Sequence, residues 1–236
     1  MKIWTILAAA ILDILNPQRC CSCDELVSHV HNGICAHCLG QINKVSGFVN
    51  VIQKDVSDIY SMDNRKWYLD ECVPLQVYHG EMKKVIQSIK YDRRVSLISV
   101  MSKPVKRLID EKNWVFDCIV PVPMKRVNRI QRGFNQAELL AKQVSRLSGI
   151  PCKDILIEKG HAKTQKSLQI HERFVNVLGR FALKSKNVTI SGMRILLIDD
   201  VYTTGATLNE CARILKKNGA SYVLAVTLAG TPRKKD

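Results

Sequence analysis

The chain has 236 residues, 46% of them apolar, with only 12 glycines and 7 prolines. These proportions exclude a collagen, a coiled coil and a disordered tail, and they fit one globular domain or slightly more. The formal net charge of +15 is spread along the chain and should attract polyanions, namely phosphorylated small molecules, nucleic acid or anionic lipid.

The first predicted element is an amphipathic helix between Ile3 and Leu15, because apolar residues recur there at helical spacing. The longest apolar stretch is roughly half the length that crosses a bilayer, so no membrane span is expected. Asp13, Asn16 and Pro17 stand where a signal peptide would need small residues before its cleavage site. The sequence therefore favours a cytoplasmic protein over a secreted one.

The cysteines are the next feature, since five of the nine lie close together near the N-terminus. Cys20-x-x-Cys23 and Cys35-x-x-Cys38 form two knuckles, each able to present two thiolates to one tetrahedral ion. This spacing predicts a structural zinc site in a reducing compartment, with no open coordination position for catalysis. The alternatives are a redox dithiol or buried free cysteines. Cys21 is expected not to ligate the ion.

A domain boundary is predicted near residue 70. Residues 1–70 would contain the apolar helix, the four-cysteine ribbon and a linker, and residues 71–236 would form the main domain. Predicted strands in this domain cover residues 75–78, 116–122, 154–158, 193–198 and 222–228. Predicted helices cover residues 81–90, 95–110, 135–148 and 207–218.

Apolar strands that alternate with helices are typical of a mostly parallel sheet covered on both faces. The expected fold is therefore α/β, a doubly wound and mostly parallel sheet with a small N-terminal zinc-binding segment. In such sheets ligands bind at the carboxyl ends of the strands. We therefore expect the chemistry just after Val122 and Ile198.

The segment after Ile198 has the residues of a sugar-phosphate site. Backbone N–H groups of residues 203–207 would lie at a helix N-terminus, which favours an anion of phosphate size. Gly205 lets the backbone approach a ligand closely, and neighbouring threonines add hydroxyl donors. Asp199 and Asp200 would repel a phosphate but can accept hydrogen bonds from two vicinal hydroxyls. The segment therefore predicts a ribose 5-phosphate site.

Plainer interpretations of this segment remain open. Thr207 and Glu210 have the spacing of a capping box, and an acidic pair at a strand end can be a helix cap or a magnesium site of another enzyme class. The glycine-rich motifs of ATP-binding loops and of dinucleotide-binding folds are absent, so neither a nucleotide triphosphatase nor a dinucleotide oxidoreductase is supported.

Residues 195–207 closely resemble the motif with which type I phosphoribosyltransferases bind 5-phosphoribosyl 1-diphosphate. Two further segments, Pro121-Val122-Pro123 and Arg132-Gly133-Phe134-Asn135-Gln136, resemble the signature of the ComF family (ComFC, GntX). The cysteine knuckle pair that follows an apolar helix and a proline is similar to that family as well. The resemblance covers nearly the whole chain.

The resemblance implies a phosphoribosyltransferase-like fold and assigns the sugar-phosphate residues. Asp199 and Asp200 would hold the ribose hydroxyls. The residues that would surround the 5-phosphate are Val201, Thr203, Thr204, Gly205, Ala206 and Thr207.

The resemblance also implies a site for the departing diphosphate. The turn after Val120 would receive the diphosphate through a magnesium ion, next to Arg126, Arg129 and Arg132. Family members usually have an arginine where Asn128 stands. Residues 163–169 are similar to the mobile flap of these enzymes, in which Lys163 would add positive charge. The implied catalytic residues are Asp199, Asp200, Lys163 and Arg132.

Family resemblance further implies a role in natural transformation, with single-stranded DNA and other competence proteins as candidate partners. Cations recur on the predicted helices 81–90 and 95–110, and with Tyr91 they suggest a face that tracks phosphates and stacks a base. A solvated helix surface is the alternative. The cations are Lys83, Lys84, Lys90, Arg93, Arg94, Lys103, Lys106 and Arg107.

Three functions remain open at this point. The protein is a phosphoribosyltransferase with an unidentified acceptor, a sensor that binds the activated sugar without turnover, or a DNA-handling module that uses the domain as a scaffold.

Overall fold

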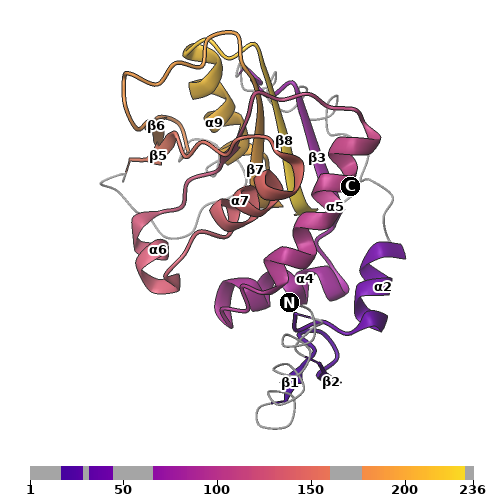
Figure 1. Ribbon diagram of the computed structural model, residues 1–236. Helices are drawn as coiled ribbons and strands as arrows, with labels where there is room; N and C mark the ends of the chain where they lie inside the picture. Colours follow the sequence, from indigo (N-terminus) through magenta and orange to yellow (C-terminus); the bar gives the residue numbers. More distant parts are fainter. Residues whose placement is uncertain (1–16, 29–31, 45–65, 160–176, 232–236) are drawn as a thin grey trace, which may run out of the picture.

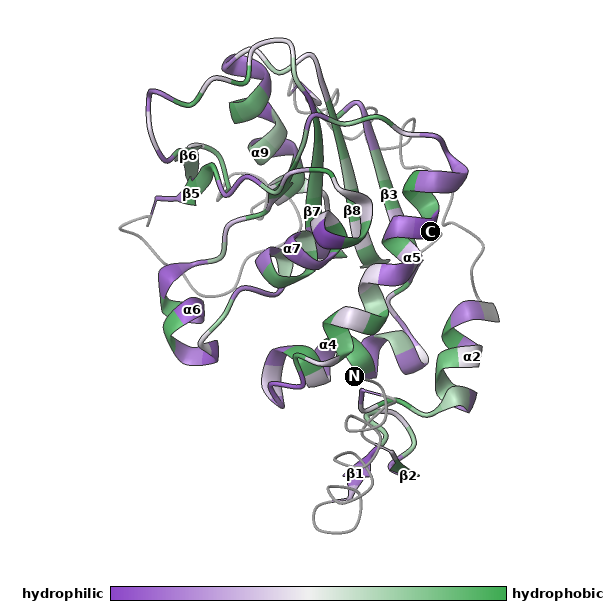
Figure 2. Cartoon of the chain, viewed as in Figure 1, coloured by the Kyte–Doolittle hydropathy of each residue, from purple (hydrophilic) through white to green (hydrophobic). Residues whose placement is uncertain are grey.

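The computed structural model describes residues 17–28, 32–44, 66–159 and 177–231 (Figure 1). Its centre is a four-stranded parallel sheet in the order β3 (Glu71–Val77), β8 (Tyr222–Gly230), β7 (Arg194–Tyr202), β4 (Cys118–Pro121). The two middle strands pair on both sides, and Figure 2 shows them in the hydrophobic colour. The predicted parallel α/β sheet is confirmed.

Successive side chains of a strand point to opposite faces of the sheet. Because both faces carry apolar side chains, helices cover both of them. Leu196 and Ile198 pack in a buried cluster with α4 (Gly80–Tyr91), α5 (Leu97–Glu111) and α7 (Gln136–Ser148). Ile195 and Leu197 pack in a second cluster with α9 (Ala206–Lys217) on the opposite face. The four helices are apolar on one side only, as Figure 2 shows. This arrangement is the predicted doubly wound fold.

The N-terminal segment contains β1 (Gln18–Arg19), β2 (Leu26–Val27) and α2 (Ala36–Lys44), and it lies beside α4 (Figure 1). Its buried side chains, Ile34, Cys38 and Ile42, belong to the same cluster as those of α4 and α5. The Gln76 amide donates to the Ile42 carbonyl at 2.8 Å. The division near residue 70 stays a prediction.

Three parts of the main domain differ from the sequence prediction. Strand β7 continues through Tyr202 instead of ending at Ile198. The predicted strand 154–158 is present as β5 (Leu156–Glu158), but it pairs antiparallel with β6 (Phe181–Leu183) outside the main sheet. The short helix α6 (Arg126–Arg132) was not predicted, because it has no buried residue and so no apolar periodicity.

The connection from β4 to α7 is held by one buried side chain. The Asn135 Oδ1 accepts from Ala137 N at 3.1 Å and caps α7, while its Nδ2 donates to the Val122 carbonyl at 3.0 Å. These two bonds tie the start of α7 to the loop that leaves β4. They join the segments 121–123 and 132–136, which lie apart in the sequence.

No helix within the described ranges is both long and apolar enough to cross a membrane. The predicted helix 3–15 lies outside the described residues.

Candidate functional site

A pocket of about 190 Å³ opens where β4 ends. Strand β4 pairs with β7 only as far as Ile198, whereas β7 continues beside β8 to Tyr202. The loop after β4, α6, the start of α7 and the small β5–β6 sheet surround the space beyond the end of β4. The pocket is lined by Lys90, Val122, Pro123, Met124, Lys125, Asn128, Arg132, Asn135, Gln136, Glu158, Arg180, Phe181, Asp199, Asp200 and Thr207.

Asp199 and Asp200 lie on this extension of β7 rather than in the turn after it, and both line the pocket. Asp200 lies on the same face of β7 as Ile198. It forms an ion pair with Lys90 of α4, with 2.6 Å between Oδ2 and Nζ. Both side chains are largely buried, at 16% and 18% exposure. Asp199 lies on the same face of β7 as Leu197, the face that α9 covers. Its Oδ1 accepts a hydrogen bond from Asp200 N at 2.8 Å.

The carboxyl group of Asp199 has a raised pKa. Burial, and then the neighbouring charge of Asp200, raises the pKa of Asp199 to about 7, against the smaller opposing effects of the Asp200 N–H and of Lys90. Near neutral pH the pocket therefore holds one carboxylate that can change its protonation state when a ligand binds.

The turn after β7 lies at the start of α9, as predicted. Gly205 is the N-cap residue with φ of +76°, and a Cβ there would lie 2.8 Å from the rings of Trp67 and Tyr202. Only glycine fits this position. Thr204 Oγ1 accepts from Ala206 N at 3.4 Å. Of the turn residues, Thr207 lines the pocket described here.

The capping-box interpretation of Thr207 and Glu210 does not describe this helix. The N-cap is Gly205, without a side-chain cap bond. The buried Glu210 carboxylate instead accepts from Gly179 N at 2.7 Å and from Arg213. Glu210 thus connects α9 to the residue that leads into β6, and Thr207 is not used as a cap.

The predicted diphosphate arginines are placed differently from one another. Arg132 lines the pocket, and its guanidinium lies 5.3 Å from the ring centre of Tyr91. Arg129 forms an ion pair with Glu138 at 3.1 Å, and neither it nor Arg126 lines the pocket. Lys163, together with the predicted flap 163–169, lies outside the described residues.

Several pocket residues were not assigned to the site from the sequence. The sequence predicts Lys90 as part of the basic face of the helices, and it indicates no role for Lys125, Gln136, Glu158 and Arg180. Glu158, at the end of β5, forms an ion pair with Arg180, which directly precedes β6, a contact that no sequence spacing indicates. Gln136 belongs to the signature 132–136, so the family resemblance contained a signal for it.

The predicted basic face is interrupted by contacts within the chain. Most of its cations have a partner, either a carboxylate or a backbone carbonyl. The partners are Asp200 for Lys90, Asp110 for Lys106, Glu111 for Arg107, and the carbonyls of Ser22, Arg19 and Gln131 for Lys84, Arg94 and Arg93.

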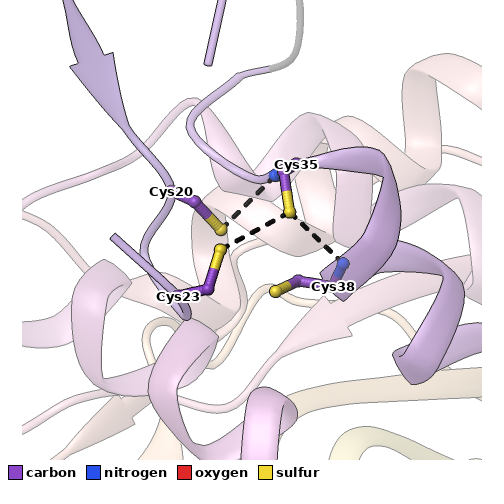
Figure 3. A group of neighbouring side chains, drawn as sticks. All are labelled: Cys20, Cys23, Cys35 and Cys38. Atoms are coloured by element: carbon purple, nitrogen blue, oxygen red, sulfur yellow. Dashed lines mark hydrogen bonds between the residues drawn. The ribbon is translucent and has the colours of Figure 1, made fainter. Parts of the chain in front are cut away.

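The four predicted zinc ligands converge in the N-terminal segment (Figure 3). The sulfurs of Cys20, Cys23, Cys35 and Cys38 all lie within 4.8 Å of one another. Cys23 Sγ and Cys35 Sγ are 3.7 Å apart, too far for a disulfide of about 2.05 Å. Zn–S bonds of about 2.3 Å place the sulfurs of a tetrahedral site about 3.8 Å apart. The cluster can therefore hold a zinc ion.

The electrostatics of the cluster also favour a cation. Although burial opposes ionisation, backbone N–H groups, including those of Cys35 and Ser22, lower the pKa of Cys20 to about 6. Burial and the neighbouring thiols raise the pKa of Cys38 to about 12. A divalent ion offsets the cost of gathering four thiolates. Burial, and then the Cys20 charge, raises the pKa of Cys21 to about 11, and Cys21 is not in the cluster.

Comparison with known proteins agrees with this fold. The profile of the phosphoribosyl transferase domain family matches residues 105–236, more than half of the chain. The chain therefore belongs to the phosphoribosyl transferase domain family.

Individual relatives narrow the likeness. Competence protein F of Haemophilus influenzae is 28% identical over 222 residues, which are 89% of this chain and 96% of that protein. Competence protein ComFC of Bacillus subtilis is 28% identical over 210 residues, 83% of each chain. DNA utilization protein YhgH of Escherichia coli is 29% identical over 160 residues, 65% of this chain and 69% of that protein. The predicted resemblance to the ComF family is confirmed.

The zinc site predicts different outcomes for two cysteines that lie near each other. Cys38→Ser should lower bound zinc from about one ion per chain to near zero and lower the free energy of unfolding by on the order of 3 kcal/mol or more, because the ion folds the segment. Cys21→Ser is the matched control and should retain the metal. Elemental analysis and chemical denaturation measure both. Full zinc content in Cys38→Ser would contradict the ligand set.

The raised pKa of Asp199 predicts how stability depends on pH. An unfolded chain releases the Asp199 proton near pH 3.9, whereas the folded chain keeps it until about pH 7. Stability should therefore fall as the pH rises from about 4 to about 7. Asp199→Asn removes this loss, so its melting temperature should exceed that of the wild type at pH 8 and approach it near pH 4.

The exposed Asp154, which pairs with Lys184, provides the control for this measurement. Asp154→Asn should show no gain in melting temperature that grows with pH. A lower melting temperature for Asp199→Asn than for the wild type at pH 8 would disprove the electrostatic assignment.

Proposed function

We propose that this pocket binds 5-phosphoribosyl 1-diphosphate and that the protein is a phosphoribosyltransferase of unidentified acceptor. The main support is the placement of Asp199 and Asp200 beyond the end of β4, directly before a helix N-terminus and opposite a basic loop. The acids offer acceptors for two ribose hydroxyls, and the turn offers N–H donors for a phosphate. The membership of the domain family supports the same ligand class.

The reaction that suits these residues is displacement of diphosphate at the anomeric carbon. Lys125 and Arg132 line the pocket on the side of the loop after β4 and would stabilise the charge that develops on the leaving diphosphate. Carboxylate and diphosphate oxygens are ligands that magnesium prefers, and the ion would supply further charge neutralisation. The side chains hold and orient the sugar, and no protein nucleophile is needed.

We place this activity in DNA uptake and natural transformation, in the cytoplasm. Support comes from the names of the relatives, which are competence proteins and a DNA utilization protein. Four clustered thiols that hold zinc suit a reducing compartment. Other competence proteins are the partners that this role suggests.

A second candidate function is the handling of single-stranded DNA, with or without turnover of the sugar. The net charge of +15 favours it, as does the name of the YhgH relative, a DNA utilization protein. Affinity for an oligonucleotide that falls steeply with salt and persists when Asp199 and Asp200 are replaced would favour this function over sugar binding.

The proposal predicts a calorimetric result. The wild type should bind 5-phosphoribosyl 1-diphosphate with magnesium, and Asp199→Ala combined with Asp200→Ala should weaken binding by about a hundredfold or more, because two hydrogen-bond acceptors for the ribose are lost. Asp110→Ala combined with Glu111→Ala is the matched control, since it removes two adjacent exposed carboxylates on α5. Unchanged affinity in the Asp199 and Asp200 variant would refute the site.

A further inference from the structure

One buried amide nitrogen in the pocket has no hydrogen-bond partner among the residues that the structure describes. Gln136 is the first residue of α7 and lines the pocket, yet it is only 3% exposed. Its Nε2 has no hydrogen-bond partner among the described residues. A buried donor without an acceptor destabilises a protein by about 1–3 kcal/mol, so such groups in native structures need an explanation.

The neighbouring Asn135 provides the contrast. Asn135 is a buried amide as well, but both ends of its side chain are bonded, to Ala137 N and to the Val122 carbonyl. Asn135 therefore explains how the start of α7 is held against the loop after β4. Gln136 takes no part in that contact, so its buried Nε2 donor is available to a ligand in the pocket.

The charges around Gln136 indicate which group it would meet. Its own helix presents a positive N-terminus. Lys125 and Arg132, from the loop after β4 and from α6, line the same pocket. The acidic residues come from other walls of the pocket: Asp199 and Asp200 from β7, and Glu158, which is paired with Arg180, from β5. The surroundings of the loop and the two helices favour an anionic oxygen, and an amide N–H is a donor for one.

We propose that the Gln136 amide donates a hydrogen bond to a diphosphate oxygen of the bound ligand. This inference rests on the proposed function and extends it, because it assigns a residue that distinguishes a sugar diphosphate from a sugar monophosphate. In this account the unpaired donor is kept because the ligand satisfies it.

Gln136→Met tests the proposal, since methionine is similar in volume and lacks the donor. Affinity for inorganic diphosphate with magnesium and for 5-phosphoribosyl 1-diphosphate should fall about ten- to hundredfold, the value of a hydrogen bond to a charged group. Affinity for ribose 5-phosphate should not change. The melting temperature without ligand should stay equal or rise, because a buried unpaired amide is removed.

Gln143→Met is the control, because it makes the same change on α7 outside the pocket, and it should leave all three affinities unchanged. Gln136→Glu is the second variant: its carboxylate should weaken diphosphate binding at least as much as methionine does.

Three results would overturn the inference. In the first, Gln136→Met and Gln136→Glu bind inorganic diphosphate as well as the wild type does. In the second, the methionine variant melts several degrees lower, which indicates a structural bond. In the third, the affinity of Gln136→Met for ribose 5-phosphate falls as much as its affinity for diphosphate. A wild type that binds diphosphate but not 5-phosphoribosyl 1-diphosphate would refute the proposed function and leave the Gln136 assignment standing. Binding of neither ligand would refute both.

Discussion

Strand β7 outlasts its neighbour β4, and the site depends on that difference in length. Backbone pairing with β4 stops at Ile198, whereas pairing with β8 continues to Tyr202. Asp199 and Asp200 are therefore held rigidly by a central strand while one edge of that strand is open to a pocket. If β4 were longer, its backbone would occupy the space where the pocket lies. The two carboxylates are therefore fixed in position by the sheet and are still accessible to a ligand, as loop residues are.

The same placement has an electrostatic cost. Two adjacent carboxylates at a largely buried strand end repel each other, and burial disfavours the charge of each. The ammonium group of Lys90 pairs with the Asp200 carboxylate, whereas the pKa of Asp199 is raised, so that its carboxyl keeps a proton to higher pH. Such a balance is typical of a binding site in which a ligand, rather than the protein, completes the interactions. The Gln136 Nε2, which has no partner among the described residues, is a second instance in the same pocket.

Local sequence was enough to predict the features that depend on residues near each other in the chain. The four-cysteine cluster and the turn 203–207 were predicted from residue type and spacing. Most helices of the main domain were predicted from apolar periodicity. Contacts between distant segments were not predictable in this way. The Lys90 and Asp200 pair joins α4 to β7, and Glu158 and Arg180 meet because β5 and β6 pair antiparallel. Asn135 and Gln136 look equivalent in sequence, and only the structure shows that the Asn135 amide is bonded at both ends while the Gln136 Nε2 has no partner within the described part of the chain.

The central claim is that Asp199, Asp200 and the turn after them hold a phosphorylated pentose. A crystal structure of the protein with 5-phosphoribosyl 1-diphosphate and magnesium tests it most directly. The account predicts ribose hydroxyls within hydrogen-bond distance of both carboxylates and 5-phosphate oxygens on the backbone N–H groups of residues 203–207. A sugar bound elsewhere, with the ion pair between Lys90 and Asp200 intact and the turn without phosphate, would contradict it.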